Sequence, residues 1–453
     1  MKRWLWIPLA ALAAVAPSAA RADGPEQPQT APSAGGRRMT IDECIAVAVQ
    51  RNPDALSSEL EVRAAEAARA GTMGEFGPKL RLEGNALQWN SPFDVVFAPP
   101  GTPGPTPPIR VRDAFSWIGT ASLIQPITPI YAIYEAYKVR DLGVDVAQIQ
   151  KSVARRDVAF RVAEVYLRLL EAIRLHDVAT TSVTQLEAQK KPAPSLYTNG
   201  VIGKNDVLRA DLALAGAKER VIQTEGEITL GQGRLATAMG MRAGPPIEPV
   251  PLAADVPPAD EPTVESAQAH ALAQRIELRE VALRTQQADG RVAQARARLF
   301  PVASLVGSYQ HTEGSAFTQL NAAYFGVTAT WDAWDWGTTI KGIDEAAARR
   351  DQAALARIKL EDELVLEARQ SFVAATTARA ALDVARSALE QAEENYRIVG
   401  RRFGAAEATS FDVVDAEALL TQARARIETT LYGYHVARVA LERATGAMTP
   451  RVR

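Results

Sequence analysis

The sequence predicts a mainly α-helical protein with two similar halves, each containing a β-hairpin and a long antiparallel helical hairpin. Two observations support this fold class. Residues of the first half recur in the second half at a constant spacing. In each half, the period of apolar residues also changes from two, typical of a strand, to alternating steps of four and three, typical of paired helices.

The N-terminus has the features of a secretory signal peptide. A basic start precedes an apolar run, from about Leu5 to Val15, and then Ala20-Arg21-Ala22. We therefore predict a signal peptide over residues 1–22 and a disordered segment over residues 23–38. The mature chain contains no uncharged apolar run of about 18 residues, so it could enter a membrane only through β-strands.

Composition argues against several other functions. The formal net charge is −2 without a sustained basic stripe, so no nucleic-acid partner is predicted. The single cysteine, Cys44, excludes an intramolecular disulfide and is expected to be buried. His176 is expected to pack between helices rather than bind a metal. Since no nucleophile–base pair or phosphate loop is found, no enzyme activity and no cofactor are predicted.

The duplication is visible in paired residues. Tyr166 and Phe372 are separated by 372 − 166 = 206 positions. The same offset relates Asp206 to Asp412. Earlier in the halves the offset is 223, so the first half carries 223 − 206 = 17 extra residues, which we assign to a loop over Ser91–Arg110.

These spacings divide the mature chain into three segments. Repeat 1 is expected over residues 39–240, a Pro-rich extended linker over residues 241–262, and repeat 2 over residues 263–449. Each repeat is predicted to contain a helix, two strands and a helical hairpin, in that order. The first helix has a clear start, because Thr40 and Glu43 form a capping-box pattern.

Two amphipathic strands are expected in each repeat. Their alternating apolar residues lie at Leu80–Ala86, Phe115–Leu123, Ala303–Tyr309 and Phe325–Trp331. One apolar face and aromatic residues near the ends are typical of outer-membrane barrel strands. An amphipathic strand of a soluble sheet has the same pattern, but the signal peptide and the duplication favour a membrane.

The number of strands predicts an oligomer. Spanning β-structure has no open edges, and bacterial barrels begin at about eight strands, so four strands per chain cannot close a barrel. Two copies would leave little lumen, whereas three copies would give 3 × 4 = 12 strands around a water-filled pore. A trimer is therefore favoured.

Long helices are expected after each strand pair. Apolar residues recur at steps of four and three over Val158–Leu186 and over Leu364–Val399, in the same register. A helix over Asp344–Val399 would be roughly 84 Å long at about 1.5 Å per residue, too long for a globular domain. Second helices are expected over Asp206–Met239 and Asp412–Thr445, which completes a hairpin in each repeat.

Two similar turns form the predicted hairpin tips, and each is followed by acidic residues. The pattern of Thr409 and Asp412 fits a capping box, so a cap alone would explain Asp412. Asp415 is one turn further and caps nothing obvious. Threefold repetition would place six carboxylates around one aperture, and such a ring selects cations and gates pores. We favour the ring for Asp415 and allow both roles for Asp412.

In combination, these motifs resemble the TolC-like outer-membrane efflux protein family over about Thr40–Gly446. The opening helix "MTIDECIAVAVQRNP", the strand starts "FGPKL" and "FPVASL", and the tips "YTNGVIGKNDVL" and "FGAAEATSFDVV" occur in the family's order. The resemblance implies a homotrimeric channel in the outer membrane, with a 12-stranded β-barrel continued by a periplasmic α-barrel.

The resemblance also implies partners. A periplasmic adaptor (membrane fusion) protein and an inner-membrane transporter would dock to the channel, which would serve passively as the exit duct for efflux or type I secretion. Drug, metal-ion and protein export all remain open. A soluble periplasmic coiled-coil scaffold or adaptor is the alternative, because its hairpin would also be long and Ala-rich.

The resemblance assigns roles at the tips. The family's tip has Tyr, Gly three residues later, Ser or Thr, and then Asp-Val-Leu. The first tip keeps Tyr197, Gly200 and Asp206 but has Gly203 at the Ser/Thr position. The second keeps Thr409 and Asp412, while Phe403 replaces Tyr and Ala406 replaces Gly. These residues are expected to form the adaptor-docking tips.

Residues matching Asp412 and Asp415 constrict the periplasmic entrance in the family. A basic residue that latches some members closed falls at Ala408, so this latch is absent or is supplied by Arg401 or Arg402. Pro192 and Pro194 are a further departure. They are expected to break the helix shortly before the first tip, where an adaptor would dock.

Overall fold

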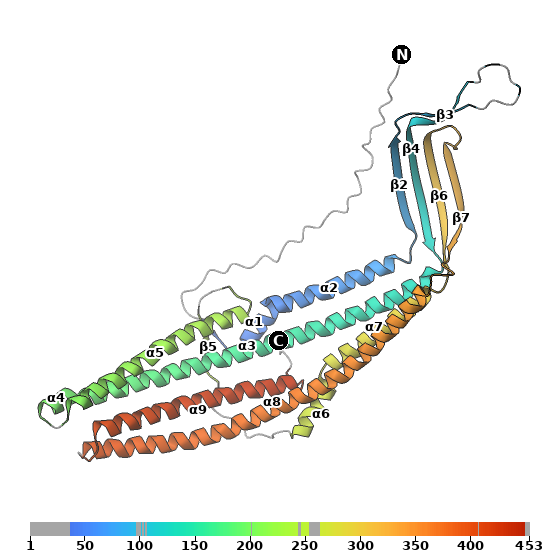
Figure 1. Cartoon of the computed structure of the whole chain (residues 1–453). Helices are drawn as coiled ribbons and strands as arrows, with labels where there is room; N and C mark the ends of the chain where they lie inside the picture. The colour runs from blue at the N-terminus through green and yellow to red at the C-terminus, as the bar shows by residue number, and fades with distance from the viewer. Residues whose placement is uncertain are drawn as a thin grey trace.

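The computed structural model describes residues 37–96, 101, 104, 107–200, 202–242, 246–252, 263–405 and 407–448. A β-sheet stands at one end of a long bundle of helices, and the helical hairpins point away from it (Figure 1). The predicted signal peptide, residues 23–36 and most of the predicted linker lie outside the described residues. Among the described residues, no helix is both long enough and apolar enough to cross a membrane.

The two halves repeat the same elements. The first contains α1 (Ile41–Arg51), α2 (Pro53–Gly74), β2 (Lys79–Gln88), β3 (Phe93–Val95), β4 (Ile109–Pro126), α3 (Pro129–Lys190), α4 (Ala193–Thr198) and α5 (Lys204–Ala238). The second contains α6 (Val264–Gln274), α7 (Glu277–Ala297), β6 (Val302–Ser315), β7 (Asn321–Thr330), α8 (Thr338–Gly404) and α9 (Ser410–Ala444). The duplicated order of β-hairpin and helical hairpin is confirmed.

The sheet is antiparallel with the order β2-β4-β6-β7, so β2 and β7 are its edges. Leu82, Ala121 and Tyr309 lie in register across three strands and mark the apolar face. On the neighbouring positions, Glu83 pairs with Thr120 and so marks the polar face. The predicted alternation is therefore present in the folded sheet.

The loop assigned to Ser91–Arg110 is partly wrong. β3 lies inside it and pairs with β4, with Val95 opposite Ile109. Its Asp94 forms an ion pair with Arg110 at 3.0 Å. β4 has 18 residues against ten in β2, and β3 provides the partner for the part that extends beyond β2. Three residues are too few to show an alternating period.

The sequence analysis also missed a pair of short parallel strands. β1 (Arg37–Met39) pairs with β5 (Ile247–Pro249), so residues 37 and 38 of the predicted disordered segment form a strand. The hydroxyl of Tyr166 in α3 donates to the carbonyl of Val250 at 2.7 Å and holds this pair against the helices. Cys44 is fully buried beside it, and burial raises the pKa of its thiol to about 11. Its predicted burial is confirmed.

The long helices are longer than expected. α3 has 62 residues and α8 has 67, against the 56 positions predicted for the second one. The added first turn of α8 has its own cap. The carboxylate of Asp335 accepts a hydrogen bond from the backbone N–H of Thr339 at 2.7 Å, after Gly337 has turned the chain with a φ of +83°.

Each half contains a break between its first two helices, α1 and α2 or α6 and α7. The residue at the break is hydrogen-bonded to the C-terminal end of the last helix of that half, α5 or α9. Asn52 donates to the carbonyl of Ala238 at 2.8 Å. Arg275, which corresponds to Asn52 at the offset of 223, donates to the carbonyl of Ala444 at 3.2 Å. Ala238 and Ala444 are themselves 444 − 238 = 206 positions apart, so the two contacts are equivalent.

In the second half this contact belongs to a network of charges. Arg275 and Arg156, whose side chains are 5% and 7% exposed, both bind Glu277. Arg275 also binds Glu367 in α8. Burial alone would raise the pKa of Glu277, but hydrogen bonds from Arg156 and Arg275 lower it to about 2. The network therefore joins α3, α7 and α8 through ionised groups.

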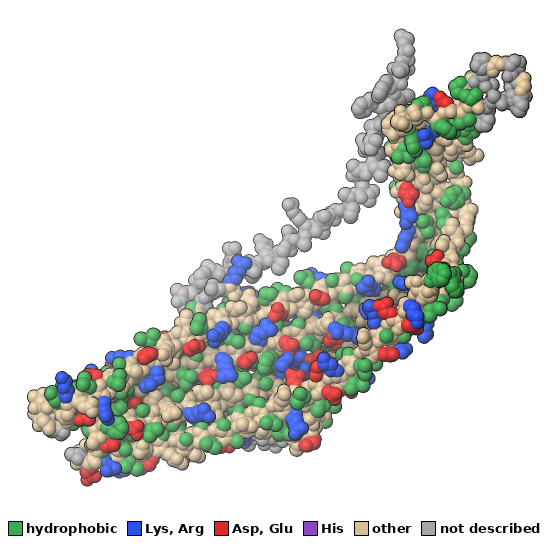
Figure 2. Space-filling view, in the orientation of Figure 1, with side chains coloured by type: hydrophobic (Ala, Val, Ile, Leu, Met, Phe, Trp, Pro, Cys, Tyr) green, Lys and Arg blue, Asp and Glu red, His purple; other side chains and the backbone are tan. Residues whose placement is uncertain are grey.

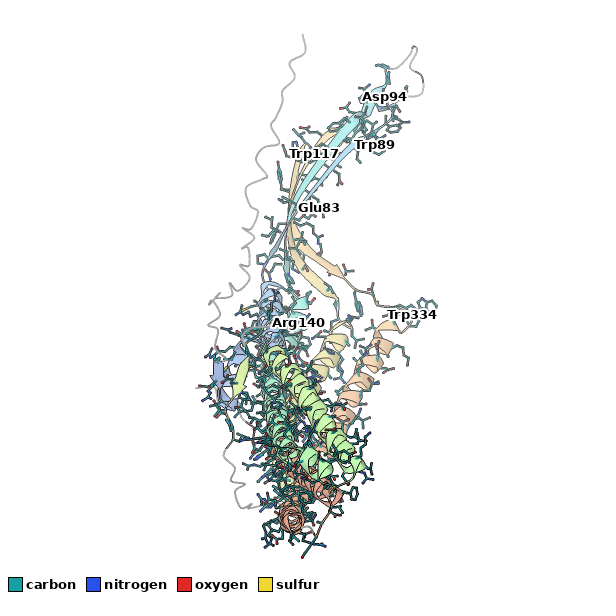
Figure 3. The ribbon with its side chains drawn as sticks, turned by 90° about the vertical axis from the view of Figure 1, so that its left-hand side faces the viewer. Glu83, Trp89, Asp94, Trp117, Arg140 and Trp334 are labelled. Carbon is teal, nitrogen blue, oxygen red and sulfur yellow. The ribbon has the colours of Figure 1, made fainter. Side chains whose placement is uncertain are left out.

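The two faces of the molecule differ. The charged residues of β2 are Lys79, Arg81 and Glu83, which share the polar face of the sheet. Figure 2 shows charged side chains on this strand, so the polar face is the one viewed there. Figure 3 is turned by 90° from that view. It shows that the β1–β5 pair lies on the side of the helices that faces away from the viewer in Figure 2.

Candidate functional site

The candidate site consists of the two hairpin tips. Figure 1 shows both tips at the end of the helices farthest from the sheet. The first tip joins α3 to α5 and contains α4, and the second joins α8 directly to α9. The structure therefore brings together two turns that lie about 200 residues apart in the sequence.

The first tip is interrupted by its prolines. α3 ends at Lys190, as the prediction from Pro192 and Pro194 required, and α4 forms a separate short helix. Gly200 then reverses the chain with a φ of +75°, a conformation that favours glycine. Tyr197 lies on α4 with 48% of its surface exposed.

Asp206 stabilises the start of α5. Its carboxylate accepts a hydrogen bond from the backbone N–H of Gly203 at 3.0 Å. Gly203 has no side chain with which to return a bond, so this tip has only half of a capping box. The family's Ser or Thr at this position would supply the missing half.

The second tip has the complete capping box. The hydroxyl of Thr409 accepts from the backbone N–H of Asp412 at 3.3 Å, and the carboxylate of Asp412 accepts from the backbone N–H of Thr409 at 2.7 Å. The pKa of Asp412 is lowered, chiefly by this backbone hydrogen bond, then by the Thr409 hydroxyl and more weakly by Arg402. The predicted cap is therefore present, and Asp412 is ionised.

Asp415 has no such role. Both Asp412 and Asp415 are exposed on α9. In the part of the chain that the structure describes, Asp415 forms no hydrogen bond or ion pair. The side chain is therefore available for an interaction outside this chain, whereas the carboxylate of Asp412 is already engaged.

The remaining predicted tip residues lie at the end of α8. Phe403 is half-buried in its last turn, and Arg401 and Arg402 are exposed beside it. Arg402 donates to the carbonyl of Glu407 at 3.4 Å, which holds it at the turn. A latch formed by Arg401 or Arg402 stays a prediction, because its partner would belong to another chain.

Two contacts between the hairpins were not predicted. The guanidinium of Arg209 in α5 lies 4.9 Å from the ring centre of Phe411 in α9. Further from the tips, the carboxylate of Glu417 is 2% exposed and accepts from the hydroxyls of Ser182 at 2.7 Å and Thr421 at 2.8 Å. A sequence period identifies a buried face but does not show which distant helix covers it.

The site has the chemistry of a docking and electrostatic surface. It presents exposed carboxylates, an exposed tyrosine and two arginines at one end of the molecule. Over the described residues, no group of three or more His, Cys, Asp or Glu side chains is placed to hold a metal ion. His176 instead shares a hydrogen bond of 3.1 Å with Thr224 between α3 and α5.

Comparison with known proteins gives both a family and a fold. Residues 268–447 match the family described as "Outer membrane efflux protein". No curated protein matches the chain by sequence.

Solved structures match over most of the chain. The outer membrane channel CmeC of Campylobacter jejuni is 16% identical, with a TM-score of 0.74 over 90% of this chain and 85% of that one. The outer membrane protein VceC of Vibrio cholerae is 16% identical, with a TM-score of 0.71 over 90% and 96%. The open state of the MtrE outer membrane channel of Neisseria gonorrhoeae is 16% identical, with a TM-score of 0.71 over 91% and 90%.

The sequence match covers the second repeat, and the structural match covers both repeats and the sheet. Residues 268–447 are therefore similar to the outer membrane efflux protein family, and the described residues have the fold of these solved outer membrane proteins.

Proposed function

We propose that three copies of this chain form an outer-membrane channel that conducts substrates passively from the periplasm to the exterior. The sheets would combine into a 12-stranded barrel, and the helices would continue it as a tube in the periplasm. The observation that carries this proposal is a sheet with one apolar face whose outer strands, β2 and β7, each have one edge without a partner in the described residues.

The sheet is incomplete by itself. Its apolar face exposes large side chains, including Leu80 at 69%, Phe325 at 75% and Val327 at 64%. These side chains would face lipid, while the polar face would line water. The edges β2 and β7 run in opposite directions, so β7 of one copy can pair with β2 of the next and continue the same antiparallel order.

The helices also lack a partner. α8 forms the edge of the helical layer and exposes Leu355 at 64%, Ile358 at 56% and Leu366 at 54%. An exposed apolar stripe of this length on a soluble helix marks a contact surface. In a closed trimer, α2 and α8 of neighbouring copies would cover each other, as β2 and β7 do in the sheet.

At the entrance, Asp415 would form a ring of carboxylates on the axis, with Asp412 as a cap that can also contribute. The tips would be the docking surface for a periplasmic adaptor, which would connect the channel to an inner-membrane transporter. Tyr197, Gly200 and Asp206 would contribute from the first tip, and Phe403 and Thr409 from the second.

Oligomeric state and conductance test the function. The purified mature chain should give a mass of three subunits in native mass spectrometry and should form steps of conductance in a planar lipid bilayer. A monomer that stays in the soluble fraction and does not bind liposomes would contradict the proposal and favour the scaffold alternative.

Substitution at the entrance tests the ring. Replacing Asp415 with Asn removes three charges from a trimer but no hydrogen bond that the structure shows, so assembly should be unchanged. We expect weaker block of the current by multivalent cations added on the periplasmic side. Glu390, exposed on α8, provides a matched control as Glu390→Gln. Equal block of the Asp415→Asn variant and the wild type would argue against the ring.

A further inference from the structure

A groove lined by arginine lies between α7 and α8, near the sheet. Its volume is 530 Å³. Arg284, Arg291 and Arg298 line it from α7, and Arg349 lines it from α8. The three α7 arginines are seven residues apart, which is close to two helical turns, so they form one stripe along the helix.

Two of the four arginines have no carboxylate partner. Arg284 pairs with Glu280 at 2.6 Å, and Arg349 pairs with Glu345 at 2.5 Å. In the part of the chain that the structure describes, no carboxylate lies within ion-pair distance of Arg291 or Arg298. Four arginines minus the two glutamates that pair with them leave a net charge of 4 − 2 = +2 per chain.

The stripe is separate from the contact between α7 and α3. α7 packs against α3 through Gly290, where an added side chain would meet Val139 at 2.6 Å, and Ala288 and Val292 are buried. The three arginines lie on a different side of α7 from Gly290.

The duplication does not require this charge. At the offset of 223, the positions in α2 that correspond to Arg284, Arg291 and Arg298 are 61, 68 and 75, which hold Glu, Ala and Glu. The first repeat therefore forms the same helix without the arginines. Their presence on the second repeat alone is explained better by a ligand than by packing.

We propose that these arginines form a cationic collar in the lumen, below the barrel, which concentrates anions and receives the carboxylate, phosphate or sulfonate group of a substrate in transit. This inference rests on the proposed channel, with the groove between α7 and α8 opening into its lumen. Three copies would place 3 × 2 = 6 net positive charges at one level. Arginine presents paired N–H donors that fit such oxyanions bidentately.

The collar and the acidic entrance would act in series at opposite ends of the tube. Asp415 lies at the tip, whereas Arg298 adjoins the first residues of β6. The contribution of the collar is therefore measured as a change relative to the wild-type channel. It should also stay constant between pH 5 and pH 9, because arginine remains protonated over this range.

Reversal potentials in a KCl gradient across a planar bilayer test the collar. Replacing Arg291 and Arg298 together with Gln should lower the chloride-to-potassium permeability ratio about sevenfold, because losing a local potential of roughly one kT acts on the two ions in opposite directions. The single variants should give intermediate ratios. The charge-conserving variant Arg291→Lys/Arg298→Lys should keep the wild-type ratio.

Arg296 provides the matched control. It is exposed on the same helix, two residues before Arg298, and forms no ion pair within the described part of the chain, but it does not line this groove. Arg296→Gln should leave the ratio unchanged. If the single and double variants conduct with the wild-type ratio, or if Arg296→Gln changes it equally, the collar is refuted while the channel stands. A wild-type protein that gives no conductance would instead refute the channel itself.

Discussion

Asp206 and Asp412 occupy equivalent positions at the two tips, and each binds the backbone N–H three residues before it. Three positions further on, the tips differ, because Arg209 in the first corresponds to Asp415 in the second. Arg209 packs on Phe411 of the other hairpin, whereas Asp415 forms no hydrogen bond or ion pair with the residues that the structure describes. The duplicated scaffold keeps the cap and changes the charge that it presents.

The two repeats differ again five residues after Asp206 and Asp412. Asp211 corresponds to Glu417. Asp211 pairs with Lys190 on the partly exposed surface of its own hairpin, whereas Glu417 is buried against Ser182 of the other hairpin. The contact between repeats therefore depends on Arg209 of the first repeat in one pair and on Glu417 of the second repeat in the other.

The largest expected difference concerns the helix breaks. Arg275→Ala would remove the donor to the carbonyl of Ala444 and leave Glu277 and Glu367 with one arginine each, so it should destabilise the protein by about 2–3 kcal/mol. Asn52→Ala removes a buried hydrogen bond and should cost about 1–2 kcal/mol. Thermal unfolding followed by circular dichroism checks the order. Equal losses would show that the charge network adds nothing to the contact common to both repeats.

The next comparison is between Glu417 and Asp211. Glu417→Ala removes a buried acceptor and leaves the hydroxyl of Ser182 unpaired, so we expect a loss of about 1–3 kcal/mol in unfolding free energy. Asp211→Ala breaks a partly exposed ion pair, which should cost about 0–1 kcal/mol. The measurement is urea denaturation of both variants in the same detergent. A larger loss for Asp211→Ala would reverse our ranking of the two hairpins.

A smaller effect is expected where the tips touch. Arg209→Ala and Phe411→Ala should each weaken the tip contact by about 0.5–1 kcal/mol, and the double variant should lose no more than the larger single loss. Hydrogen exchange over the first turns of α5 and α9 provides the readout. Losses that simply add would show that Arg209 and Phe411 do not interact.

The smallest effect is the pH dependence of the second cap. The pKa of Asp412 is lower in the folded protein than in the unfolded chain. Its stabilisation is therefore complete above about pH 3.9 and is lost as the pH falls through the folded pKa. Exchange at the start of α9 should be constant from pH 7 to pH 5, after correction for the intrinsic rate, and should rise in more acidic solution. Asp412→Asn should abolish this rise; if it persists in the variant, another group is responsible.

The periodic parts of the fold could be predicted from the sequence. Alternation gave the four strands of the main sheet, steps of four and three gave the long helices, and Pro192 gave the early end of α3. The cap at Thr409 was also predicted, because a capping box involves residues only three positions apart. β3 and the β1–β5 pair were missed, since three-residue strands have no period and owe their structure to a partner elsewhere in the chain.

The sequence by itself therefore determined the order of elements, the duplication and the two capped turns, because each depends on neighbours along the chain. Only the tertiary structure decided which side chains meet across the two repeats: Glu417 with Ser182, Arg209 with Phe411, and Arg156 with Glu277. It also decided that the arginines of α7 share a groove with Arg349 of α8. Such contacts depend on how helices distant in sequence are packed, and a local pattern contains no record of that packing.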